Sequence, residues 1–188
     1  MNPARALVTP LADAESQSSL LVGSSKYVLA QIRSLIEELS DEQYAQSSDG
    51  RKPSIGKHVR HVVEFYQSLF SNLASESEEM LCYDDRQREQ SIEVSRRSAL
   101  DSLLRIDATL DSLSKNDIDL TLASRVHPEK PMVHTSSSVY REMVYLLDHT
   151  VHHMALIKYL AEFVGVNLPH EFGVAPSTLV FEAQDQDR

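Results

Sequence analysis

Apolar residues recur every three or four positions in four separate stretches of the chain, a period that is typical of amphipathic α-helices. The four stretches cover, in order, residues 18–39, 55–73, 88–114 and 140–165. Between the third and the fourth, the segment IDLTLAS alternates, HPEKP suits a turn, and MVHT suits a returning strand. The pattern therefore predicts an all-α fold, a four-helix bundle, with a small β-hairpin before the last long helix.

Segments outside these stretches set the limits of the predicted domain. Residues 1–17 contain two prolines and show no sustained period, so we expect a surface arm. Residues 18–181 would form the bundle, and 182–188 an acidic tail. The apolar side chains near the end of the bundle segment are expected to pack on the helices; they are Phe172, Leu179, Val180 and Phe181.

Serine and glycine residues mark where the predicted helices begin and end. Ser54 precedes the second stretch, and the cluster 136–138 offers three serines before the fourth, each able to accept a hydrogen bond from a free helical N–H. Gly165 suits the end of the fourth helix.

Composition excludes several classes of partner. The chain has 188 residues, of which 41% are hydrophobic and 24% charged, so we expect one compact domain. A net charge of −10 argues against nucleic-acid binding and against an anionic membrane surface, because both require clustered cations. The single cysteine, Cys82, excludes an internal disulfide and fits a reducing compartment. Without a long apolar run, the expected location is the cytoplasm.

Histidines in the second and fourth stretches are the candidate metal ligands. His149 and His153 are four residues apart, so a helix places both imidazoles on one face, where they can share an ion. Buried, hydrogen-bonded imidazoles are the alternative, and His152 is turned toward the edge of that face. A third ligand would come from elsewhere, and the second stretch offers His58 and His61. Judged only by the apolar positions of the second stretch, His58 lies deeper in the buried face of the helix and His61 nearer its border.

Four segments of the chain together resemble the DinB/YfiT-like superfamily of metal-dependent enzymes, which is unrelated to the DNA polymerase that shares the DinB name. These segments are SIGKHVRHVVEFYQSL from Ser54, YDDR from Tyr83, DHTVHHMALIKYL from Asp148 and FGVAPSTL from Phe172. The resemblance implies a four-helix bundle that holds one divalent transition metal ion, zinc or nickel, on three histidines.

The metal ligands that the resemblance implies are His61, His149 and His153. The family pattern places its helix-two histidine seven residues after the capping serine, which selects His61, whereas the apolar stripe favours His58. The chain also departs from the family at its last ligand. Many members continue from that histidine with Arg-Gly-Gln, whereas His153 is followed by Met-Ala-Leu.

The function that the resemblance implies is a thiol S-transferase acting through a metal-bound thiolate. The cofactors would be the divalent metal and a low-molecular-weight thiol, and the partner a small-molecule substrate. A metal-dependent hydrolase using a metal-bound hydroxide is one alternative, and a non-catalytic bundle stapled by the ion is another. An apolar face left over on the first helix or the tail would suit a homodimer. Catalytic and thiol-binding residues remain unassigned.

Overall fold

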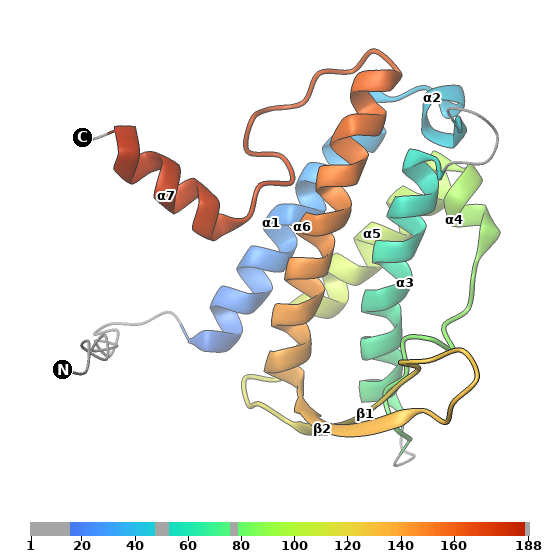
Figure 1. The fold of residues 1–188 in the computed structure, drawn as a ribbon, viewed down its shortest axis with the longest axis vertical. Helices are drawn as coiled ribbons and strands as arrows, with labels where there is room; N and C mark the ends of the chain where they lie inside the picture. Colours follow the sequence, from blue (N-terminus) through green and yellow to red (C-terminus); the bar gives the residue numbers. More distant parts are fainter. Residues whose placement is uncertain (1–15, 48–52, 76–78, 187–188) are drawn as a thin grey trace.

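Four long helices lie side by side in the computed structural model, which describes residues 16–47, 53–75 and 79–186 (Figure 1). The helices are α1 Gln17–Glu38, α2 Asp41–Ala45, α3 Ile55–Ala74, α4 Gln90–Val94, α5 Arg96–Asp111, α6 Val139–Phe163 and α7 Pro176–Gln186, and the strands are β1 Asp119–Ser124 and β2 Val133–Ser138. The predicted helical bundle and the hairpin before the last long helix are confirmed. Residues 1–15 of the predicted arm lie outside the described residues.

Serine side chains begin the two helices that carry the candidate ligands. Ser54 Oγ accepts a hydrogen bond from Lys57 N at 3.1 Å, and Ser138 Oγ accepts one from Arg141 N at 3.3 Å. Gly165 follows α6 with a φ of 83°, a left-handed conformation that favours glycine at a helix end. The predicted caps and the predicted end of α6 are confirmed.

The core fixes α3 and α6 against each other. Both helices contact one another, and α1 contacts α6. The side chains that meet there are almost fully buried: Ile32, Ile36, Val59, Val63, Tyr66, Leu69, Met143, Leu146 and Ile157. Full burial of an aliphatic side chain contributes about 1.5–3 kcal/mol, so this contact holds the histidine faces of α3 and α6 at a fixed separation.

The helix predicted over residues 88–114 is two helices, because the chain is extended at Ser95 between them. Ser95 has a ψ of 114°, which ends α4, and its side chain accepts a hydrogen bond from Ser98 N and so begins α5. Leu104 follows the apolar spacing of this stretch but is 51% exposed. The segment between the first two predicted helices also contains the short helix α2, whose Tyr44 is buried.

The hairpin carries a third extended segment that leads toward the histidines. Strands β1 and β2 pair antiparallel, from Asp119 opposite Ser138 to Ser124 opposite Val133. Leu81 N donates to Thr121 O at 2.9 Å, and Leu81 O accepts from Ala123 N at 2.8 Å. This anchoring places residues after Leu81 beside α3, although they lie between the second and third predicted helices.

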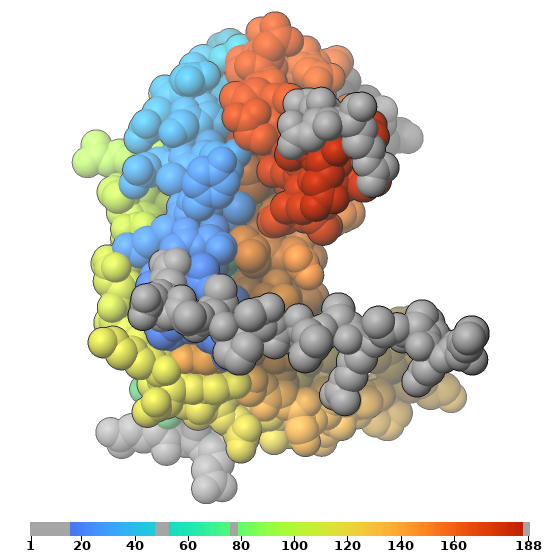
Figure 2. Space-filling view, turned by 90° about the vertical axis from the view of Figure 1, so that its left-hand side faces the viewer, coloured from blue at the N-terminus to red at the C-terminus, as the bar shows by residue number. Residues whose placement is uncertain are grey.

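The end of the chain packs only in part. Phe172 is 2% exposed, as predicted, whereas Val180 and Phe181 on α7 are 57% and 66% exposed. Their predicted packing is wrong because α7 extends away from the bundle (Figure 1). A cavity of about 410 Å³ lies between α1, α6 and this segment, on the hollowed face that Figure 2 shows. Its lining includes Val28, Val151 and Met154 and none of the histidines of α3 and α6.

Within residues 16–47, 53–75 and 79–186, every helix is too short or too polar to cross a membrane.

Candidate metal centre

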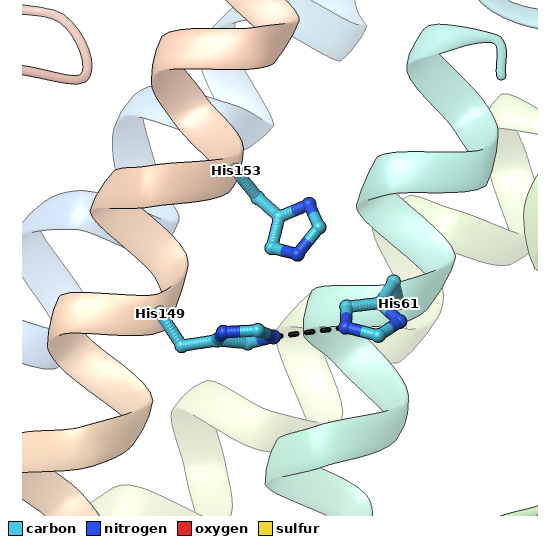
Figure 3. Close-up of side chains that lie close together, drawn as sticks. All are labelled: His61, His149 and His153. Atoms are coloured by element: carbon cyan, nitrogen blue, oxygen red, sulfur yellow. Dashed lines mark hydrogen bonds between the residues drawn. The ribbon is translucent and has the colours of Figure 1, made fainter. Parts of the chain in front are cut away.

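Three imidazoles from α3 and α6 point toward one another (Figure 3). One nitrogen from each of His61, His149 and His153 lies within 4.8 Å of the others. The shortest contact joins His61 Nε2 and His149 Nε2, which are 2.8 Å apart. The structure therefore brings together the three residues that the sequence analysis selected, while their binding of an ion stays a prediction.

A fourth histidine contacts the cluster from its edge. His58 lies on α3 one turn before His61, and its Nδ1 is 2.9 Å from His153 Nδ1. Both candidates on α3 thus reach α6, but they contact different rings: His58 contacts His153, and His61 contacts His149. His152 is exposed, in agreement with its predicted place at the edge of the helix face.

Burial keeps these imidazoles uncharged. The rings are partly desolvated, which lowers the pKa of His61 to about 4, with a further contribution from the Arg86 charge. Desolvation, and then the neighbouring histidines, lower the pKa of His153 to about 3. The pKa values of His58 and His149 are also lowered, again mainly by desolvation. At neutral pH all four rings are therefore neutral, the form that binds metal ions.

Aromatic side chains hold the ligand rings in place from one side. Phe65 stacks on His149 with 4.6 Å between ring centroids, and also contacts the His61 ring at 4.5 Å. Tyr83 in turn stacks on Phe65, with 4.8 Å between ring centroids, and Tyr145 stacks on His149 at 5.4 Å. These contacts restrict ring rotation, so the imidazole nitrogens keep their directions.

Arg86 joins the centre from the segment that the hairpin anchors. Its Nη2 is 3.1 Å from His61 Nδ1, its Nη1 donates to Tyr83 O at 2.9 Å, and its Nε donates to Glu64 Oε2 at 3.3 Å. Arginine can only donate, so His61 Nδ1 is an acceptor and the neutral ring carries its proton on Nε2. That proton lies between His61 Nε2 and His149 Nε2. Sequence periodicity could not find this contact, because Arg86 lies outside the long helices.

Two buried carboxylates near the centre are fully engaged. Glu64, 2% exposed, accepts from Glu89 N at 2.8 Å and pairs with two arginines, Arg60 at 3.5 Å and Arg86 at 3.3 Å. Glu142, 0% exposed, accepts hydrogen bonds from three side chains: Tyr83 at 2.9 Å, Ser137 at 2.5 Å and Arg141 at 2.8 Å. Neither carboxylate lies in the cluster that could hold an ion.

The donor set fits a divalent transition metal ion. Zinc bonds to imidazole of about 2.0–2.1 Å at tetrahedral angles place two ligand nitrogens roughly 3.3 Å apart. The closest pair, at 2.8 Å, is joined by the His61 Nε2 proton, which would move to Nδ1 and displace the Arg86 contact when an ion binds, and all three nitrogens lie within 4.8 Å. Small ring movements and this change of the His61 tautomer would bring the three nitrogens to such distances. Three protein ligands also leave a coordination position open, as in catalytic zinc sites.

The arrangement is a helical bundle with a three-histidine cluster between two facing helices. The chain belongs to the DinB superfamily, which it matches over residues 26–157. This range contains all three cluster histidines. FK506-binding protein 5 of Rhizopus delemar is 34% identical to the chain over 103 residues. That match covers 53% of this chain and 27% of the relative, so the chain spans about a quarter of the relative's length. No solved structure matches significantly.

Proposed function

We propose that this protein is a metal-dependent thiol S-transferase, which joins a low-molecular-weight thiol to an electrophilic small molecule. The observation that carries the proposal is a cluster of three neutral imidazoles without a carboxylate ligand. A divalent ion on such ligands would keep its full charge and lower the pKa of a coordinating thiol, so that the thiolate forms near neutral pH. We propose zinc or nickel as the metal, as the family resemblance implies, and imidazole ligands suit both.

The residues around the cluster support thiol transfer over hydrolysis. Hydrolysis of an ester or amide gains from a general base within hydrogen-bond reach of the attacking water. The two buried carboxylates near the histidines, Glu64 and Glu142, are instead held by arginines, a tyrosine, a serine and a backbone N–H. Thiol transfer needs no such base. The thiol loses its proton to solvent, its sulfur forms a bond to the electrophilic carbon, and the leaving group departs with the electron pair.

Glutathione, bacillithiol and mycothiol, each with an aryl chloride as electrophile, test the proposal on protein loaded with zinc or nickel. We expect conjugation that disappears after metal removal and in His149→Ala. His127→Ala is the matched control, because His127 is exposed and lies outside the cluster.

Conjugation at an unchanged rate in metal-free protein would contradict the proposal. Ester or amide turnover that needs metal but no thiol would favour the hydrolase instead. Metal binding without turnover, together with a large loss of thermal stability on chelation, would favour the non-catalytic bundle.

A further inference from the structure

We infer that His58 is a positioning residue, which accepts a hydrogen bond from His153 Nδ1–H and so directs His153 Nε2 into the metal centre. The inference rests on the proposed metal centre. It does not depend on which reaction the centre supports.

The contact between the two rings requires a single proton. His58 Nδ1 and His153 Nδ1 are 2.9 Å apart, a normal hydrogen-bond length. A neutral imidazole carries one N–H and one lone pair, so one of these nitrogens donates and the other accepts. Two N–H groups cannot face each other at this distance, so at least one of the two nitrogens presents a lone pair.

The direction of this hydrogen bond decides whether His153 can bind an ion. If His153 Nδ1 accepted, the ring's proton would lie on Nε2, and the nitrogen that remains to face the other ligands would have no free lone pair. If His153 Nδ1 donates, Nε2 presents its lone pair toward His61 and His149, beside which the ring lies (Figure 3). Only the second direction is compatible with His153 as a ligand, and it makes His58 the acceptor.

The helix geometry suits this division of roles. His58 and His61 are three residues apart on α3, so one rigid helix supplies both a ligand and the residue that orients a ligand of α6. Carboxylates and carbonyls usually accept from metal-bound histidines. A neutral imidazole performs the same task without adding negative charge, which leaves the charge of the ion undiminished. Arg86 at His61 Nδ1 is the opposite case, because it only donates.

Three variants distinguish the effect of the hydrogen-bond acceptor at His58 from the effect of its ring packing. His58→Ala removes the acceptor, His58→Phe removes it but keeps a ring, and His58→Asn keeps an acceptor oxygen near the position of Nδ1. Cobalt(II) titration gives the dissociation constant and the absorption spectrum of the ligand set. Loss of a hydrogen bond to a ligating histidine costs about 10–100-fold in metal affinity. We expect that loss in Ala and Phe, recovery to within a few-fold in Asn, and the same saturated spectrum in every variant.

A second measurement uses the metal-free protein. Long-range proton–nitrogen NMR spectra identify which ring nitrogen of His153 carries the proton, and we expect Nδ1 in the wild type and in His58→Asn. Wild-type affinity in the folded Phe variant, weak binding in Asn, or the Nε2–H form of His153 in the wild type would overturn the inference. A saturated spectrum that changes in Asn would make His58 a ligand instead. If the wild type binds no cobalt, the proposed function fails, while the NMR result still decides the hydrogen bond.

Discussion

Lowering the pH from about 7.5 to about 5.5 should weaken metal binding less at this centre than at three histidines with ordinary pKa values. Protons compete with a metal ion for each imidazole lone pair. With an unshifted pKa of about 6.5, each ring would lose about tenfold in metal affinity over this interval, and three rings about 10³-fold.

The structure predicts a much smaller loss. With pKa values of about 4 and about 3, His61 and His153 stay almost unprotonated at the lower pH. The pKa of His149 is also lowered, so its contribution stays below that of an unshifted ring. The total loss should therefore be less than about tenfold. The pKa values of these rings are lowered because a desolvated imidazole disfavours the protonated form.

Cobalt(II) titrations at several pH values, in buffers that do not bind the metal, measure this dependence directly. A short peptide containing three histidines serves as the unshifted reference. A loss near 10³-fold in the folded protein would contradict this expectation, because it would show that the rings are as basic as in the unfolded chain. His134→Ala should leave the pH profile unchanged, since His134 is exposed on β2 and outside the cluster.

Two further substitutions test the surroundings of the centre. Arg86→Gln should reduce the free energy of unfolding by about 1–3 kcal/mol, because buried Glu64 loses a charged partner. Its metal affinity should hold or rise, since a glutamine oxygen can accept from His61 Nδ1–H; a tenfold weaker cobalt Kd in the folded variant would contradict this. Gly56→Ala should destabilise the fold by about 1–3 kcal/mol in urea unfolding, since the added Cβ would lie 2.0 Å from Glu93 O. Unchanged stability would show that α3 and α4 do not pack so closely.

Periodicity sufficed for the elements whose apolar faces are long. It predicted the four-helix bundle and placed His149 and His153 on one face of α6, because spacing along a helix determines which side chains are neighbours. It did not find the break at Ser95, since a single extended residue leaves the apolar spacing on either side intact.

Contacts between elements were beyond the sequence pattern. The spacing of apolar residues indicates which face of one helix is buried. It does not show that His58 contacts His153 while His61 contacts His149. The family pattern supplied that choice. Arg86 reaches His61 only because Leu81 pairs with the hairpin, a link between segments about forty residues apart in the sequence. The exposed position of α7 likewise depends on where the preceding segment leaves α6.

Metal content of the purified, untagged protein shows whether the three histidines hold an ion. Wild type, His61→Ala, His149→Ala and the control His127→Ala would be saturated with zinc or nickel, freed of excess ion, and measured by plasma mass spectrometry. We expect about one equivalent in the wild type and the control, and none in the two cluster variants. Wild-type protein that retains no ion after reconstitution, or cluster variants that retain a full equivalent, would contradict it.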